Sequence, residues 1–302
     1  MYDIIIVGGG PAGLTAAIYA RRASKKVLVL EALVVGGQII QAEKIENYPV
    51  CPNINGVDFA TKLYNQTKEL GAEIKFERVI NINDLKDYKE VITKNNTYQG
   101  KTVILATGSE NRKLGLDNED KLVGHGVSYC ATCDGMFFKG KDVAVIGGGD
   151  TAIDDARYLS NIANKVYLIH RRDTFKAEAQ EIEELKTKTS VEFILNSNVV
   201  KLNTTDDNLS SIDVKNNDGN ITTINVSGIF IAVGRVPENQ NFAKIINLDN
   251  YGYVIAGENC HTNVDGIFVA GDSRVKSLRQ LVTATSDGAI AATEAIKYIN
   301  KR

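Results

Sequence analysis

A strand, a glycine-rich turn and a helix follow one another twice in this chain, and the repeat restricts the fold strongly. The first copy starts with the apolar run Tyr2–Val7 and turns at Gly8-Gly9-Gly10-Pro11-Ala12-Gly13. The second starts with Asp142–Ile146 and turns at Gly147-Gly148-Gly149-Asp150-Thr151-Ala152. Nearly unbroken apolar runs are typical of parallel strands buried on both faces. The sequence therefore predicts an α/β protein with two Rossmann-like dinucleotide-binding domains of three layers each.

The glycine spacing of the first copy predicts a phosphate site. Gly8 permits the tight turn, Gly10 lets the backbone approach a pyrophosphate, and Gly13 lets helix and strand pack closely. The helix opens at Pro11-Ala12, and its N-terminus supplies amide donors. Glu31 ends the second strand about 20 residues on, where a carboxylate bonds ribose hydroxyls and repels a 2′-phosphate. The first site should therefore take adenosine without that phosphate, as in FAD or NAD.

In the second copy, basic residues take the position that Glu31 has in the first. His170-Arg171-Arg172 follows the apolar strand, and Lys176 comes soon after. Arginine clamps a phosphate bidentately, whereas lysine acts as a point charge. A solvated basic surface is the simpler alternative. After a dinucleotide turn the cluster favours NADP(H) over NAD(H), held also by Gly147, Gly149, Asp150, Thr151 and Ala152.

Between the two turns lies a pair of cysteines, Cys130 and Cys133, with Asp134 directly after them. Such a pair cycles between dithiol and disulfide, and its thiol pKa can fall from ~8.5 towards ~7. Half a zinc site or two buried thiols are the alternatives, but the chain has no second Cys pair to complete a zinc site. The pair therefore indicates redox chemistry and no metal. Asp134 is either a general acid and base or the cap of a local turn.

Composition narrows the class of protein. A chain of 302 residues is long enough for about two domains, and its formal net charge of −2 argues against a nucleic-acid or acidic-membrane partner. No apolar run reaches the ~18 residues of a membrane span, and no basic leader precedes the first strand. Only four cysteines occur, of which Cys51 and Cys260 stand alone. This usage predicts a reducing, cytoplasmic location.

Several other short segments are candidates for nucleotide contact, and each could instead be an ordinary loop, turn or strand end. Two are strand ends with a glycine corner, at Ala106-Thr107-Gly108 and before Arg235, and this corner repeats between the two halves. Arg235 is either surface charge or a contact of the nicotinamide cofactor. The remaining candidates are Gly36-Gly37-Gln38, Asn47, Gly271-Asp272 and Arg279-Gln280.

Over essentially its whole length the chain resembles the low-molecular-weight thioredoxin reductases of bacteria. The segments that carry the resemblance are the two glycine turns, Gly36-Gly37-Gln38, Cys130-Ala131-Thr132-Cys133-Asp134, His170-Arg171-Arg172, Ala270-Gly271-Asp272 and Arg279-Gln280. The cysteine motif between two dinucleotide folds also occurs in the reductase portion of alkyl hydroperoxide reductase flavoproteins. Those proteins carry an extra N-terminal domain that is not expected here.

The resemblance implies a discontinuous FAD domain, residues 1–112 and 245–302, and an inserted NADPH domain, residues 113–244, that carries the cysteines. It also implies a homodimer. It further implies a rotation between the domains, with crossovers at 110–115 and 242–246, because nicotinamide and dithiol cannot both occupy one flavin face. The FAD contacts it implies are Gly8, Gly10, Pro11, Ala12, Gly13, Glu31, Gly37, Gln38, Asn47, Ala106, Thr107, Gly108, Gly271, Asp272, Arg279 and Gln280.

The reaction implied by the resemblance passes a hydride from NADPH to FAD and then two electrons to the Cys130–Cys133 disulfide. Cys133 faces the flavin, Cys130 attacks the disulfide of thioredoxin, and Asp134 handles the thiol proton. The chain departs from the family pattern at Lys176, where arginine is usual, and at Asp150-Thr151, where Asn-Ser is usual. Two alternatives therefore remain: a ferredoxin-dependent reductase with a weak nicotinamide site, and a flavoprotein redox sensor without turnover.

Overall fold

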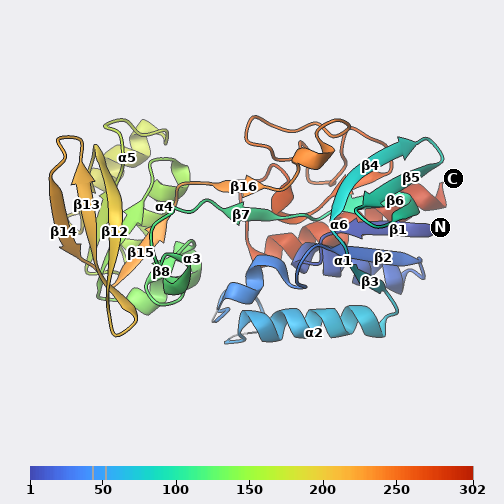
Figure 1. Cartoon of the computed structure of the whole chain (residues 1–302), viewed down its shortest axis with the longest axis horizontal. Helices are drawn as coiled ribbons and strands as arrows, with labels where there is room; N and C mark the ends of the chain where they lie inside the picture. The colour runs from blue at the N-terminus through green and yellow to red at the C-terminus, as the bar shows by residue number, and fades with distance from the viewer. Residues whose placement is uncertain (43, 52, 302) are drawn as a thin grey trace. The chain divides into compact units, whose positions relative to one another are not determined.

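The computed structural model describes residues 1–42, 44–51 and 53–301. The chain forms two compact units (Figure 1), one from Met1–Glu110 with Val236–Arg302 and one from Asn111–Arg235. Both contain a parallel sheet with helices, so the predicted α/β class, with a second Rossmann-like domain inserted into the first, is confirmed. Within the described ranges, no helix is long and apolar enough to cross a membrane.

The discontinuous unit is built on a seven-stranded sheet of order β3-β2-β1-β6-β5-β4, with β17 also paired to β6. The pairs β1–β2, β1–β6, β2–β3 and β6–β17 are parallel, whereas β4–β5–β6 is an antiparallel meander. The strands are β1 Tyr2–Val7, β2 Val27–Glu31, β3 Glu73–Phe76, β4 Val79–Leu85, β5 Tyr88–Thr93, β6 Thr97–Leu105 and β17 Ile267–Val269. The helices are α1 Pro11–Arg22, α2 Gly56–Glu69 and α6 Leu281–Asn300.

Strand β1 shows why its apolar run is unbroken. Ile4 and Ile6 pack with alanines of α1 and α6 on one face of the sheet. Ile5 and Val7 pack on the other face with meander residues such as Ile82. Both faces of the strand are therefore buried, as expected for a parallel sheet between two layers.

The inserted unit has a five-stranded parallel sheet of order β11-β10-β9-β15-β8 and a separate antiparallel sheet β12-β13-β14. Helices α3, α4 and α5 contribute to the core on one face, and the antiparallel sheet to the core on the other. Its strands are β8 Val127–Ser128, β9 Asp142–Ile146, β10 Lys165–Ile169, β11 Val191–Ile194, β12 Ser197–Thr205, β13 Asn208–Asn216, β14 Ile221–Asn225 and β15 Gly228–Ile231. Its helices are α3 Ala131–Asp134, α4 Asp150–Leu159 and α5 Ala179–Lys186.

The chain passes between the units at two short strands, β7 Ser109–Asn111 and β16 Arg235–Pro237, which pair with each other. The second passage lies at 235/236 rather than at the expected 244/245. Asn239 and Phe242, which follow this passage, explain why it lies earlier in the chain than expected. Asn239 is fully buried and donates to the carbonyls of Gly252 and Ser273 at 3.0 and 2.8 Å, and Phe242 joins the meander-side core. Residues 236–244 therefore pack with the discontinuous unit.

Candidate functional site

Three of the glycines in the first turn, Gly8, Gly10 and Gly13, have different local surroundings. Gly8 has a φ of 112°, and a Cβ there would lie 2.2 Å from the Ala106 carbonyl oxygen. A Cβ on Gly13 would lie 1.9 Å from the Gly8 oxygen, so helix α1 packs directly on the turn. A Cβ on Gly10 would meet no protein atom within 4 Å. Gly8 and Gly13 are thus required by packing, whereas the space beside Gly10 is open to a ligand.

Glu31 is held against this turn. Its carboxylate accepts a hydrogen bond from the Gly9 amide at 2.7 Å through Oε2 and one from the Leu33 amide at 2.9 Å through Oε1. A carboxylate has about four acceptor positions, so both oxygens retain capacity for further donors. The acid at the end of β2 is therefore fixed in orientation and can still accept from ribose hydroxyls.

Two other predicted segments converge on the start of α1. The Gly36 amide donates to the Gly9 carbonyl at 2.9 Å, and a Cβ on Gly37 would lie 3.5 Å from Gly10 Cα. A Cβ on Gly271 would lie 2.8 Å from the Cβ of Ala12. Segments that are far apart in sequence thus meet at the turn that contains Gly10.

The remaining candidates of this unit make contacts within the protein. Asn47 donates through Nδ2 to Gln280 Oε1 at 3.1 Å, which joins two of the predicted positions. Thr107 donates to Asn239 at 2.9 Å, and the Arg279 guanidinium lies 4.1 Å from the ring centre of Tyr253. Gln38 lies in the short 3-10 helix Gly37–Gln41, Asp272 lies in the 3-10 turn Gly271–Ser273, and Gly108 has a φ of 70°.

The second turn repeats the geometry of the first. A Cβ on Gly147 would lie 2.4 Å from the Ala232 carbonyl oxygen, just as Gly8 faces Ala106. A Cβ on Gly149 would meet nothing within 4 Å, as at Gly10. The repeat inferred from sequence therefore extends to the same close approach of turn and neighbouring strand end in both units.

The basic segment after β10 folds back on this turn. The His170 ring lies over Gly148, where a Cβ would come within 2.2 Å of it, and it stacks on Phe175 with ring centres 5.1 Å apart. The Lys176 amide donates to the Gly148 carbonyl at 2.8 Å. Burial, and secondarily the charges of Arg171 and Arg172, lower the pKa of His170. The ring is therefore neutral at neutral pH and holds the segment in place.

The charged side chains of this segment lie in solvent. Arg171, Arg172 and Lys176 are all exposed. Asp150 is the first residue of α4, where a carboxylate interacts favourably with the helix dipole. Arg235 begins β16 at the passage between the units.

Cys130 and Cys133 form a disulfide, with their Cα atoms 5.3 Å apart. Cys130 precedes the short helix α3, and Cys133 and Asp134 lie within it. Asp134 accepts a hydrogen bond from the Ser128 hydroxyl at 2.6 Å, and the same hydroxyl oxygen accepts from the Cys130 amide at 3.1 Å. Ser128 therefore links the acid to the backbone of the redox pair.

Sequence reasoning missed Ser128, because only the folded protein shows that this hydroxyl is buried beside Asp134. The two other cysteines are reduced: Cys51 is half-buried and Cys260 is buried. Burial, with a smaller effect of the Asp287 charge, raises the pKa of Cys260 to about 12. Its thiol therefore stays protonated and unreactive.

The sequence profile described as pyridine nucleotide-disulphide oxidoreductase matches residues 2–288. The chain belongs to the pyridine nucleotide-disulphide oxidoreductase family. It is 41% identical to a thioredoxin reductase of Listeria innocua, and the match covers the whole chain and 95% of that protein. It is 38% identical to a thioredoxin reductase of Bacillus subtilis, and that match covers the whole chain and 96% of the relative. The chain is also similar in structure to the crystal structure of thioredoxin reductase from Streptococcus pyogenes, with a TM-score of 0.95 and 39% sequence identity. The match covers all of this chain and 99% of the Streptococcus chain.

The resemblance to thioredoxin reductases is thus confirmed. Members of the pyridine nucleotide-disulphide oxidoreductase family use a flavin and a nicotinamide nucleotide. The residues present fit two dinucleotides, since Gly10 and Gly149 each leave open space in which an added Cβ would meet no protein atom. Each space adjoins a helix N-terminus, where backbone amides favour phosphate.

Proposed function

We propose that this chain is an NADPH-dependent, FAD-containing thioredoxin reductase. The overall reaction converts NADPH and thioredoxin disulfide into NADP⁺ and thioredoxin dithiol. The observation that carries the proposal is the Cys130–Cys133 disulfide, in the same unit as a dinucleotide turn followed by the exposed Arg171 and Arg172. A cytoplasmic location and a homodimer complete the proposal, in line with the cysteine usage and the family resemblance.

FAD is assigned to the discontinuous unit. The open space at Gly10 would take its pyrophosphate, and Glu31 would accept from ribose hydroxyls. The residues proposed to hold FAD are Gly8, Gly10, Pro11, Ala12, Gly13, Glu31, Gly37, Gln38, Asn47, Ala106, Thr107, Gly108, Gly271, Asp272, Arg279 and Gln280.

NADPH is assigned to the inserted unit. Arg171 and Arg172 would bond the 2′-phosphate, since charge-assisted bonds from guanidinium to phosphate are short and strong. Lys176 would add a point charge without a bidentate fork. The residues proposed to hold NADPH are Gly147, Gly149, Asp150, Thr151, Ala152, His170, Arg171, Arg172, Lys176 and Arg235.

Bound FAD supplies a carrier that accepts a hydride and passes two electrons on to a disulfide. The protein's own chemistry begins with the reduced pair. The Cys130 thiolate attacks one sulfur of the thioredoxin disulfide, and a thiolate leaves on thioredoxin. Cys133 then attacks Cys130 in this mixed disulfide, which restores the Cys130–Cys133 bond and releases the second thiol.

Asp134 is proposed to accept and return the thiol proton in this cycle. Its bond from Ser128 fixes one carboxylate oxygen beside the redox pair. The Ser128 oxygen also accepts from the Cys130 amide, so the acid and the cysteine segment keep one orientation. General acid–base groups of this kind typically contribute about 10²–10⁴-fold to a rate.

An anaerobic titration of the purified, flavin-loaded protein tests the electron donor. We expect bleaching of the visible flavin band by NADPH at low concentration and much weaker bleaching by NADH. Oxidised thioredoxin should then restore the band. Bleaching by reduced ferredoxin or dithionite but by neither nicotinamide nucleotide would contradict NADPH as donor, and bleaching without recovery by thioredoxin would favour a sensor without turnover.

A further inference from the structure

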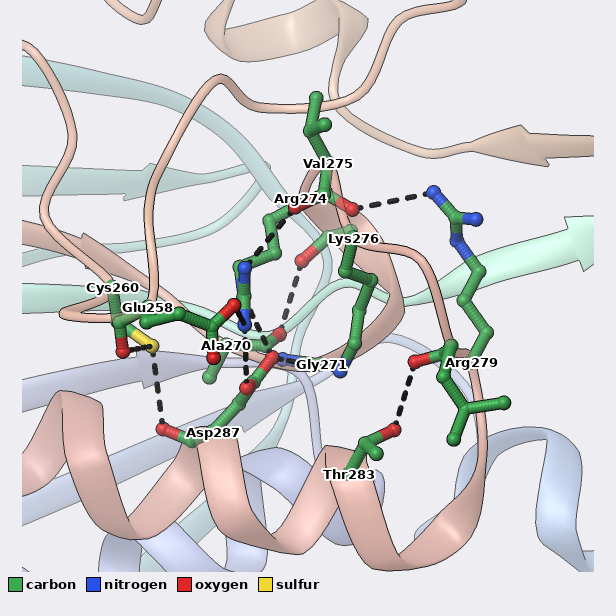
Figure 2. A network of polar contacts seen from close by, with 12 residues as sticks. Glu258, Cys260, Ala270, Gly271, Arg274, Val275, Lys276, Arg279, Thr283 and Asp287 are labelled. Atoms are coloured by element: carbon green, nitrogen blue, oxygen red, sulfur yellow. Dashed lines mark hydrogen bonds and ion pairs between the residues drawn. The ribbon is translucent and has the colours of Figure 1, made fainter.

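A buried cluster of charges lies at the N-terminal part of α6 (Figure 2). Asp287 accepts from Arg274 through two bonds, Nε to Oδ2 at 2.8 Å and Nη2 to Oδ1 at 2.9 Å. It also accepts from Lys276 Nζ at 3.0 Å. The side chains of Arg274, Lys276 and Asp287 are only 3%, 5% and 4% exposed.

The cluster holds one cation more than it has buried anions. Glu258 also reaches Arg274, at 3.4 Å, but its side chain is 91% exposed, so water screens that pair. Burial raises the pKa of Asp287, but the bonds from Arg274 and Lys276 outweigh this and leave it below its usual range. Buried ion pairs often stabilise a fold less than apolar residues of equal volume. Stability alone is therefore a weak reason for this cluster.

Asp287 also bonds the backbone beside the proposed flavin site. The Gly271 amide donates to Asp287 Oδ2 at 3.0 Å. Gly271 in turn stands against Ala12 in the first turn of α1, where its Cβ would come within 2.8 Å of the Ala12 Cβ. Gly288, next to Asp287, approaches the same residue: a Cβ there would lie 2.2 Å from the Ala12 carbonyl oxygen.

One carboxylate thus fixes how three segments meet. It anchors α6 to the Gly271 turn, and both of these pack on the start of α1, where the open space at Gly10 lies. Arg274 holds the carboxylate in one orientation through both of its oxygens. A shift of this anchor would move the Gly271-Asp272 turn relative to the phosphate turn.

We propose that Asp287, oriented by Arg274, is a positioning residue for the flavin dinucleotide that sets the approach of the Gly271-Asp272 turn to the start of α1. The inference rests on the proposed function, because it requires FAD in this unit. Asp287 acts through the Gly271 backbone and not on the flavin itself.

The test compares FAD affinity in variants of the full chain. Asp287→Ala alone leaves two buried cations, which can prevent folding, so it is also made in a Lys276→Met background. We expect the dissociation constant for FAD to be at least about tenfold higher in Asp287→Ala/Lys276→Met than in Lys276→Met, because hydrogen bonds to charged groups are strong. The flavin fluorescence measured as the protein is diluted gives the dissociation constant for FAD. The shape of the visible absorption band reports the environment of the bound flavin.

Two controls separate positioning from general stability. Glu258→Gln removes the exposed partner of Arg274 and should leave FAD affinity and the absorption band unchanged. Ile82→Ala creates a cavity in the meander-side core, far along the chain from Gly271, and should lower the unfolding midpoint of the flavin-free protein without weakening FAD. If Asp287 were purely structural, Asp287→Ala/Lys276→Met would behave like Ile82→Ala: the unfolding midpoint of the flavin-free protein would fall and the FAD affinity would stay unchanged.

The possible results are distinguishable. An unchanged FAD affinity and absorption band in Asp287→Ala/Lys276→Met, relative to Lys276→Met, would overturn the positioning role and leave the proposed function standing. Absence of FAD binding by the native protein would overturn the proposed function, and the positioning role with it.

Discussion

At the residue scale, the sign of the charge that follows the second strand distinguishes two otherwise similar glycine turns. Glu31 follows β2 and is fixed by the amides of Gly9 and Leu33. At the equivalent place after β10 the chain has Arg171 and Arg172, both exposed. A carboxylate repels a 2′-phosphate and a guanidinium binds it, so the two units should select different nucleotides.

Replacing either arginine should therefore affect NADPH selectively. We expect Arg171→Ala and Arg172→Ala each to raise the KM for NADPH about 10- to 100-fold, the value of one lost charge-assisted bond, with little change for NADH. Steady-state kinetics with both nucleotides measures this. Lys201→Ala removes an exposed cation from β12 of the same unit and serves as the control. Equal losses for NADH and NADPH would place the 2′-phosphate elsewhere.

At the element scale, the glycines of the first strand–turn–helix segment differ in how closely the rest of the protein packs on them. The Cβ that would clash at Gly13 meets backbone, which cannot move without shifting α1. The Cβ at Gly10 meets only open space, and the backbone there has a φ of −76° that alanine readily adopts.

Alanine substitutions should separate these roles. Gly10→Ala should fold, at a cost of about 1 kcal/mol for the poorer helix cap, but should bind FAD at least about tenfold more weakly. Gly13→Ala should destabilise the flavin-free protein by about 3 kcal/mol or more, because it overpacks a rigid contact. Denaturant unfolding and FAD titration measure the two effects. Full FAD affinity in Gly10→Ala would show that the open space is not the phosphate site.

Helix α4 contains a carboxyl group, that of Asp155, whose titration should change the free energy of unfolding. Burial, and after it the charge of Asp154, raise the pKa of Asp155 to about 7. The folded state therefore retains a proton that the unfolded state loses near pH 4, so this group's effect on stability becomes less favourable as pH rises from about 4 to 7.

Asp155→Asn should remove that dependence. We expect the variant to be more stable than the native protein at pH 8, by about 2 kcal/mol after allowance for partial exposure, and similar to it at pH 4. Thermal unfolding across this pH range measures the difference. Asp117→Asn, which changes an exposed carboxylate of the same unit, serves as the control. Parallel pH curves for native and Asp155→Asn proteins would exclude a raised pKa.

At the scale of the whole molecule, each unit has its own layered core. The discontinuous unit buries both faces of β1, and the inserted unit buries its sheet between helices and a second sheet. Units with separate cores commonly unfold in separate steps, and a ligand stabilises only the unit that binds it.

Two ligands should therefore act on different transitions of the intact chain. FAD added to flavin-free protein should raise the unfolding midpoint of the discontinuous unit, and adenosine 2′-phosphate that of the inserted unit. At about 100 times its dissociation constant, each should add roughly 2.7 kcal/mol. Calorimetry gives the midpoints, and hydrogen exchange assigns them to residues. A single transition shifted equally by both ligands would argue against independent unfolding of the two units.

Local features of the sequence were enough to predict the two nucleotide folds and the redox pair. Buried strands, glycine turns and the Cys130–Cys133 spacing are encoded within a few residues, because hydrophobic period and backbone freedom are short-range properties. Helix α6 likewise begins after a local signal, the capping box between Gln280 and Thr283.

Side-chain contacts between separate segments were visible only in the folded protein. Ser128 contacts Asp134 across a turn, Asp287 holds Gly271 sixteen residues away, and Thr107 meets Asn239 far along the chain. The passage at 235/236 likewise depends on Asn239 and Phe242 packing into the discontinuous unit. Periodicity shows which face of an element is buried, but the partner across that face is chosen by the packing of the whole unit.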